Sequence, residues 1–439
     1  MKGGVRQLKY QRMVCVLLAV WMLLCLTSCG NNPEKPRETE PQDPAGNSAP
    51  TEKPNDQNGE EPYELSVLSL EKALHTYYEW SDDYDRAFVR SEHSCVTLGQ
   101  EDAKAFPEMA EALSQKATMQ ENAMLDEFYN LVSAANTELD LNRDGFETYV
   151  SKLDVQVRRA DSLVISLLSD SYSDYGQLEN VRAFHGSNYD TQSGKELALT
   201  DVVKNVNQDL AAAVEKELTG HMWAGDFYSE NTVEDYFANT PYDGFSWTVD
   251  YIGVTFYFAP GDLCDEGAMT ATVSFAAHPE LFYEKYMTSP AEYTVEVPMD
   301  ISFFANWDAD GDYEELSVSG WYDDERNAYV DFGIYTEVGE YRDDCYVYDF
   351  RPYYVKAASG HYLYLFCEDF DEGLRQMKLI VFSLNEDGSV TKSGESNVSP
   401  SWLADNRFIV PTDPGKLTLD DGAQKAVFMV GSDGIPTKV

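Results

Sequence analysis

Apolar and polar residues change their spacing twice along this chain. Met13 to Leu26 is almost wholly apolar. Over residues 63–298, stretches with apolar residues three or four positions apart interleave with stretches in which apolar and polar residues alternate. After Pro298, alternation dominates. A spacing near 3.6 predicts helices and a spacing of two predicts strands. We therefore expect the α+β class: an α+β module over 63–298, followed by an antiparallel, all-β domain over 299–439.

The first half of the α+β module has five recognisable segments. The pattern predicts a helix over Leu65–Trp80, a strand over Arg86–Leu98, a long helix from Phe106 to Leu131, and strands at 155–157 and 163–168 separated by the polar interval 158–161. The second half contains a turn at Gly194 and a helix that follows Thr200 as N-cap and ends near Gly220. A hairpin with one buried face is expected over 247–258, turning at Gly253.

Four alternating runs mark the C-terminal stretch. They cover residues 330–334, 345–347, 363–367 and 377–381. Short strands separated by turn residues are typical of a β-sandwich or of propeller-like blades, and the pattern leaves both open. Cys345 and Cys367 lie in two of these runs. They are expected either to pair or to remain free, buried thiols.

The N-terminus has the features of an export signal. Four basic residues precede the apolar stretch, which is too short for a membrane span. It ends in Leu26-Thr27-Ser28-Cys29-Gly30, which resembles the lipobox of bacterial lipoproteins. We therefore expect residues 1–28 to be a cleaved signal peptide. Cys29 would then carry a lipid that holds the protein on the extracytoplasmic face of the cell membrane. The alternative is an ordinary signal peptide with an incidental cysteine.

Residues 29–62 are expected to form the lipid anchor and a disordered tether, because they hold seven prolines and no aromatic residue. The whole chain has a formal net charge of −45. Loss of the four basic residues of the signal would bring the net charge to about −49. Such a charge excludes a nucleic-acid partner by repulsion and favours cationic partners.

The middle of the chain carries an ordered series of short segments. These are Ala160-Asp161-Ser162-Leu163-Val164-Ile165-Ser166, Phe184-His185-Gly186-Ser187-Asn188-Tyr189-Asp190, residues 193–203, and Val254-Thr255-Phe256-Tyr257-Phe258-Ala259-Pro260. The series resembles the extracytoplasmic module of RsiV-type anti-sigma factors, which sense lysozyme, and the related module of some peptidoglycan deacetylases. The resemblance spans roughly residues 85–285. It implies an RsiV-like fold and a binding role at the cell envelope.

The chain also departs from that pattern. Only His185-Gly186 remains of the family's Gly-Gly-Ala-His-Gly turn, and Gly261-Asp262-Leu263-Cys264 replaces the residues usual after Pro260. No sigma-binding segment is present, so the signalling role of the family does not carry over. His185 is interpreted as a turn-stabilising residue rather than a catalytic one.

Two acidic stretches are candidate cation sites. Asp308, Asp310 and Asp312, with Glu315 after them, place carboxylates at alternate positions around Gly311, which suits Ca²⁺. The alternative is a solvated acidic turn. A second stretch contains Asp140, Asn142, Asp144 and Gly145 in EF-hand positions, but Ser151 stands where the bidentate glutamate belongs.

The sequence contains no HExxH, GxSxG, P-loop or dinucleotide motif. Whether the protein is an enzyme is therefore uncertain, and a non-enzymatic role is favoured. We expect an envelope-associated binding lipoprotein, with lysozyme or another cationic protein, or cell-wall glycan, as partner. The alternatives are a glycan- or peptidoglycan-directed enzyme or accessory protein and a purely structural surface protein. No cofactor other than Ca²⁺ is indicated.

Overall fold

The computed structural model describes residues 65–81, 87–176, 181–220, 233–263, 267–308, 310–323, 326, 328–371, 374–403 and 406–439. Glu64–Val439 forms one compact unit. The expected signal peptide, Cys29 and the tether lie outside the described residues. Among the helices in the described ranges, none has both the length and the apolar character needed to cross a membrane.

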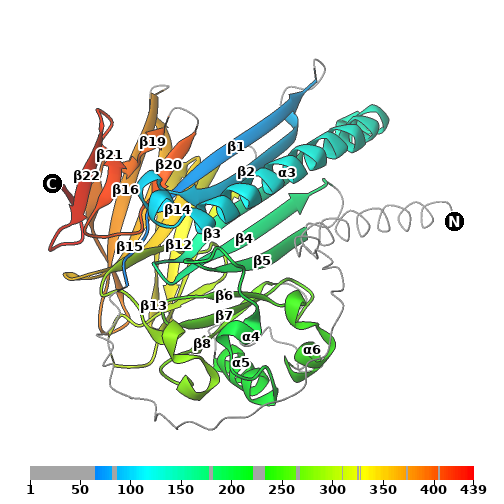
Figure 1. Ribbon diagram of the computed structural model, residues 1–439. Helices are drawn as coiled ribbons and strands as arrows, with labels where there is room; N and C mark the ends of the chain where they lie inside the picture. Colours follow the sequence, from blue (N-terminus) through cyan, green and yellow to red (C-terminus); the bar gives the residue numbers. More distant parts are fainter. Residues whose placement is uncertain are drawn as a thin grey trace, which may run out of the picture. The chain divides into compact units, whose positions relative to one another are not determined.

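A seven-stranded sheet organises the first part of this unit (Figure 1). Its strands, in spatial order, are β19 (Trp402–Leu403), β20 (Arg407–Val410), β1 (Leu70–Trp80), β2 (Ala87–Leu98), β3 (Tyr149–Ala160), β4 (Val164–Asp174) and β5 (Val181–Asp190). β2 and β3 are parallel, and the other neighbours are antiparallel. Parallel neighbours need a crossover, which α2 (Gln100–Ala105) and α3 (Pro107–Leu141) provide.

α3 is amphipathic and packs against the sheet. Figure 1 shows it lying along β1 and β2. The residues on its buried face are Met109, Leu113, Met124, Phe128, Leu131, Ala135 and Leu139. This apolar stripe, which includes Met109 and Met124, is core packing, and the expected long helix is confirmed.

The expected helix over Leu65–Trp80 is wrong, because Leu70–Trp80 is strand β1. Leu68, Leu70 and Lys72 are 2%, 0% and 0% exposed, which is the period of a strand. The pattern was hidden because a lysine occupies one of the buried positions. Its charge is neutralised inside the protein, so a position that looked polar is part of the core.

A second layer contains the sheet β6–β7–β8 and three helices. The strands are β6 (Ser246–Val249), β7 (Gly253–Phe258) and β8 (Met269–Ser274), and the helices are α4 (Leu199–Val202), α5 (Gln208–Gly220) and α6 (Val233–Asn239). The hairpin turning at Gly253 is confirmed, although both of its faces are buried rather than one. Thr200 is not the cap of the long helix. Asn207 takes that place, and its side chain accepts the N–H groups of Asp209 and Leu210.

Three antiparallel sheets make up most of the C-terminal stretch. One contains β10 (Ser302–Ala305), β11 (Glu314–Asp323), β12 (Ala328–Thr336) and β13 (Gly339–Val347). The second, in spatial order, contains β17 (Val390–Ser396), β16 (Leu374–Leu384), β15 (Gly360–Asp371), β14 (Asp349–Ala357) and β9 (Tyr293–Glu296). The third contains β18 (Ser399–Pro400), β21 (Leu417–Asp420), β22 (Lys425–Val430) and β23 (Pro436–Lys438). The first two share one apolar core, which is the arrangement of a sandwich rather than of propeller blades.

The expected boundary at residue 298 does not separate independent sheets. β20, from the C-terminal stretch, pairs with β1, and β9, from before the boundary, pairs with β14. One core cluster also joins Leu70 and Met109 to Tyr364 and Phe428. The α+β and all-β regions are therefore fused along shared strands and a shared core.

Candidate functional site

The acidic loop between β10 and β11 brings three carboxylates together. One oxygen of each of Asp308, Asp310 and Glu314 lies within 4.8 Å of the others. The N–H of Asp310 donates to Oδ1 of Asp308 and the N–H of Asp312 to Oδ1 of Asp310, both at 2.9 Å. Gly311 turns the loop with φ of 105°, a conformation that favours glycine. Oxygen ligands on a tight loop are what Ca²⁺ requires.

Strand alternation decides which glutamate joins the loop. β11 begins at Glu314, and successive side chains of a strand point to opposite faces. Glu315 is 2% exposed and accepts a hydrogen bond from Ser302 Oγ at 2.5 Å. The structure therefore places Glu314, and not the expected Glu315, beside the two aspartates. Asp312 is exposed, and its carbonyl oxygen accepts from the side chain of Asn306.

Glu314 has an electrostatic environment that suits cation binding. Burial, together with the nearby charges of Asp308 and Asp310, raises its pKa to about 7, while an N–H bond from Trp307 at 2.7 Å acts in the opposite direction. Mutual repulsion of carboxylates is relieved either by a proton or by a cation. A divalent ion would therefore compete with the proton on Glu314.

The second acidic stretch does not build an EF-hand. α3 ends at Leu141, and a short 3-10 helix, Arg143–Gly145, leads into strand β3 rather than into an exiting helix. Ser151 lies buried in β3 and donates to Glu127 Oε1 at 3.2 Å. The stretch is the connection between a helix and a strand.

His185 and Gly186 lie inside strand β5, so the interpretation of His185 as a turn residue is wrong. Burial, and then the charge of Lys116, lowers the pKa of His185 to about 4. Gly186 is needed for another reason. A Cβ at this position would lie 1.7 Å from the carbonyl oxygen of Trp247 in β6. The glycine allows β5 and β6 to approach closely.

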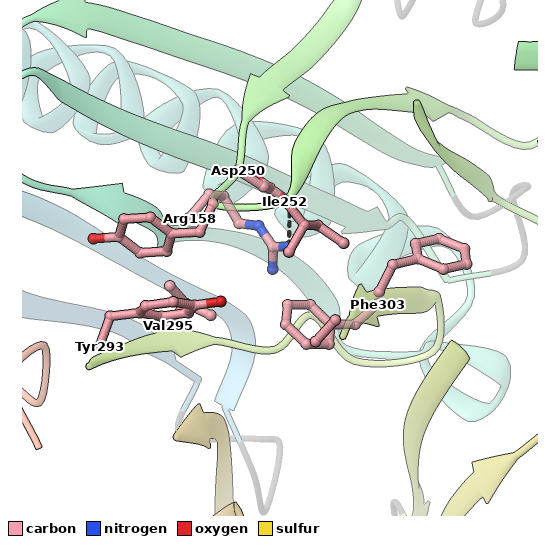
Figure 2. Close-up of a pocket in the computed structure, with 9 residues that line it drawn as sticks. Arg158, Asp250, Ile252, Tyr293, Val295 and Phe303 are labelled. Carbon is pink, nitrogen blue, oxygen red and sulfur yellow. Dashed lines mark hydrogen bonds and ion pairs between the residues drawn. The ribbon is translucent and has the colours of Figure 1, made fainter. Parts of the chain in front are cut away.

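Buried charges form the centre of the unit where the sheets meet (Figure 2). The expected polar interval 158–161 is in fact buried at the end of β3. Arg158 donates to Asp250 Oδ2 and to the carbonyl of Glu296, both at 2.7 Å, and its guanidinium lies 5.0 Å from the Phe303 ring centre. The adjoining pocket has a volume of about 10 Å³, which is the space of about one water molecule.

The neighbouring Arg159 has a protein partner for each of its three nitrogens. It donates to Asp161 Oδ2 at 2.7 Å and to the carbonyls of Tyr286 and Thr288 at 2.9 Å. Asp161 Oδ1 in turn accepts the N–H of Val164. These bonds hold the turn between β3 and β4 against the chain after β8. They connect structural elements that are far apart in the chain.

The cysteines of the sandwich are free thiols rather than a disulfide. Cys345 Sγ donates to the carbonyl of Tyr329 at 3.5 Å and Cys367 Sγ to that of Leu365 at 3.7 Å. Burial raises the pKa of both thiols, so both are protonated at neutral pH. Cys264 lies outside the described residues.

The surface of β12 and β13 is strongly acidic. β13 is the outer strand of its sheet, and Asp331 of β12 lies directly opposite Asp344 of β13. Both are exposed, as are Glu340 and Asp343. Like charges directly opposite each other destabilise a sheet. We call these four residues the acidic strand pair. Glu340 forms an ion pair with Arg342 at 3.3 Å and Asp343 accepts from the hydroxyl of Tyr341 at 3.2 Å, so the unrelieved repulsion is the one between Asp331 and Asp344.

Comparison with known proteins gave structural neighbours only. No family model and no curated protein matches the sequence. Two solved structures that are similar are DUF3298 family proteins. The one from Pseudomonas aeruginosa PAO1 has a TM-score of 0.36 and 13% identity, covering 51% of this chain and 98% of its own. The one from Bacteroides fragilis NCTC 9343 has a TM-score of 0.37 and 12% identity, covering 50% of this chain and 94% of its own.

Proposed function

We propose that this chain is a non-enzymatic binding lipoprotein, held by a lipid on Cys29 at the extracytoplasmic face of a bacterial membrane. Its partner is a cationic protein of the envelope environment, such as lysozyme. The middle region would act as an RsiV-like module, in line with the ordered segments between Ala160 and Pro260. The observation that carries the proposal is the acidic strand pair.

The acidic strand pair supports a cationic partner in two ways. Asp331 and Asp344 repel each other across the strand pair, and among the described residues no lysine or arginine forms an ion pair with either. A positively charged side chain bound between them would remove that repulsion. The net charge of −45 also draws a basic protein toward the surface and speeds encounter.

The buried centre supports a non-enzymatic role. Arg158, Arg159 and Asp250 are engaged with protein partners, and the pocket beside them has room for about one water molecule. A glycan or peptide substrate does not fit there. The residues of this buried centre therefore hold the sheets together, and the proposed binding role belongs to the surface.

The test is lysozyme binding by the full chain at physiological ionic strength. Surface charges more than about 8 Å apart are screened under that condition, so non-specific attraction fades while a packed interface persists. Replacing both Asp331 and Asp344 by Asn should weaken binding about tenfold or more. A matched control, Glu108→Gln with Asp126→Asn, removes the same charge from exposed positions of α3 and should change binding little. Binding only at low salt, or equal losses in the two variants, would reject a specific site.

The lipid anchor has its own test. Cys29→Ser should abolish labelling by a fatty-acid analogue and release or misprocess the protein, because the sulfur of Cys29 is the atom that would take the diacylglycerol carrying the labelled acyl chains. Cys345→Ser removes a thiol from the folded unit and should leave labelling intact. Equal labelling of the wild type and the Cys29 variant would remove the anchor from the proposal.

A glycan of the cell wall is the second candidate partner, and exposed aromatic rings favour it. At the free end of β1, Tyr78 is 47% and Trp80 62% exposed, with ring centres 6.4 Å apart. Flat aromatic rings with a polar edge suit the faces of sugar rings. Trp80→Ala should then reduce co-sedimentation with peptidoglycan, while Trp321→Ala, which removes an exposed tryptophan from β11, should not.

A further inference from the structure

Two histidines, a cysteine and a glutamate meet between strands β1 and β2 and helix α3. In the register of the strands, His75 lies opposite His93, and Ala73 opposite Cys95. His75, His93 and Cys95 therefore share one face of the strand pair. This face is turned toward α3, because His75 contacts Glu121 and Tyr77 contacts Phe128 of that helix.

His93 is a buried imidazole without a hydrogen-bond partner. Its side chain belongs to a residue only 3% exposed, and neither Nδ1 nor Nε2 has a hydrogen-bond partner in the structure. The ring stacks on His75 with centres 4.7 Å apart and planes 7° apart. Buried polar groups are normally hydrogen-bonded, and an exception calls for an explanation such as a bound ion. An imidazole with both nitrogens free in a protein interior is a ready ligand.

His75 uses its two nitrogens for different neighbours. Nε2 lies 3.8 Å from the Sγ of Cys95, and Nδ1 lies 3.8 Å from Oε1 of Glu121. Ligands of a tetrahedral zinc ion, bound at ~2.0–2.3 Å, lie roughly 3.5 Å from each other. The Nε2–Sγ spacing is close to that value. A carboxylate on the other nitrogen is the usual means of orienting a metal-binding histidine.

We propose that His75 Nε2, Cys95 Sγ and the imidazole of His93 bind one transition-metal ion of the Zn²⁺ class. Glu121 is a positioning residue that fixes the ring of His75. In the structure only His75 Nε2 and Cys95 Sγ lie near ligand spacing. The ring of His93 is stacked parallel to that of His75, so binding requires this imidazole to rotate out of the stack and turn a nitrogen toward the ion. Cys95 binds as the thiolate and releases its proton to water. The fourth position of the ion remains for water or a further ligand.

The surroundings of the cluster favour metal binding by Cys95 over a role of its thiol as a nucleophile. Cys95 is 8% exposed, so its sulfur is closed to a substrate of any size. The side chains of His75 and Glu121 are 25% and 44% exposed, which leaves a path for a small ion from solvent. One thiolate and two imidazoles match zinc and related ions better than the oxygen ligands of the acidic loop do. The two cation sites therefore differ in chemistry.

The test uses the purified full chain, stripped of metal, with Zn²⁺ and Co²⁺ as probes. We expect one Co²⁺ per chain at this site, with visible ligand-field bands and a near-ultraviolet thiolate-to-metal charge-transfer band. Zn²⁺ should displace these bands and raise the melting temperature. Cys95→Ser should remove the charge-transfer band, and His93→Phe, which keeps an aromatic ring for stacking, should weaken Zn²⁺ binding at least tenfold. Glu121→Gln should weaken it less, because that residue does not touch the ion.

Two control variants separate this site from the other candidates. Cys345→Ser removes a thiol from the sandwich and should leave the cobalt spectrum unchanged. Asp310→Asn removes a ligand of the acidic loop and should also leave it unchanged. The proposal is overturned if no charge-transfer band forms, if the band survives in Cys95→Ser, or if it is lost in Asp310→Asn. Loss of Zn²⁺ binding counts in its favour only for variants whose metal-free circular dichroism matches the wild type.

Discussion

The Nζ atom of Lys72 lies 2.6 Å from Oε1 of Glu296, although the two residues are 224 positions apart in the chain. Lys72 is 0% and Glu296 5% exposed. The same carboxylate accepts the N–H of Val157 at 2.6 Å and the hydroxyl of Tyr353 at 3.1 Å. One glutamate of β9 therefore links β1, β3 and β14, and it does so across the expected domain boundary.

Lys72→Met should destabilise the folded unit by about 3–5 kcal/mol, because it leaves the carboxylate of Glu296 buried without its cation. Urea unfolding of the full chain measures the change. Lys104→Met is the matched control, since Lys104 pairs with Glu101 on the surface at 63% and 84% exposure. It should cost less than about 1 kcal/mol. Similar midpoints for the two variants would show that the buried pair does not hold the sheets together.

Gly186→Ala should be strongly destabilising, by about 3 kcal/mol or more, because the new Cβ would collide with the backbone of Trp247. Backbone atoms cannot rotate away as a side chain does, so β5 and β6 would have to separate. Gly220→Ala, at the end of α5 with nothing within 4 Å, should be neutral or slightly stabilising. Thermal unfolding compares the two. Equal melting temperatures would contradict the close approach.

Acid should destabilise the protein through one buried histidine, His93, and two partly buried ones, His185 and His361. Burial lowers the pKa of His93, His185 and His361 to about 4, whereas the ordinary value is 6.5. Between these values the unfolded chain binds more protons than the folded one, so stability falls as pH falls from about 6.5 to about 4. Each histidine contributes a slope of at most about 1.4 kcal/mol per pH unit.

The histidine effect is separable from the acid response of the carboxylates. His185→Phe should reduce the slope of the free energy of unfolding against pH between pH 6.5 and 4. Above pH 7 the slope should stay as in the wild type. Urea midpoints measured in metal-free buffer across this range give the slope. A profile of unchanged slope would show that His185 is not held neutral by burial.

Calcium at millimolar concentration should raise the melting temperature of the full chain by binding to the folded state alone. Asp310→Asn or Glu314→Gln should abolish the increase, because both carboxylates belong to the acidic loop. Glu315→Gln should lower stability without changing the calcium response, since that side chain faces Ser302 in the interior. Calorimetry without any heat of calcium binding would leave the loop as a solvated acidic turn.

The spacing of apolar residues was enough to predict those helices and strands whose buried positions are all apolar. The amphipathic spacing from Phe106 to Leu131 predicted α3, and alternation around Gly253 predicted the β6–β7 hairpin. The antiparallel β character after residue 298 followed in the same way. In each case a short stretch of sequence is enough for the prediction, because the apolar residues that one helix or strand buries all lie within that element.

Tertiary structure alone decided the features that depend on distant partners. Lys72 reads as a polar position until Glu296 neutralises it, so the strand β1 looked like a helix. Glu315 and Glu314 are indistinguishable by spacing, and only the start of β11 shows which one joins the aspartates. The meeting of His75, His93, Cys95 and Glu121 likewise depends on strand register and on the docking of α3. A buried charge or a cluster of ligands is stabilised by residues that are far away in the chain. The spacing of residues within one short segment therefore cannot predict it.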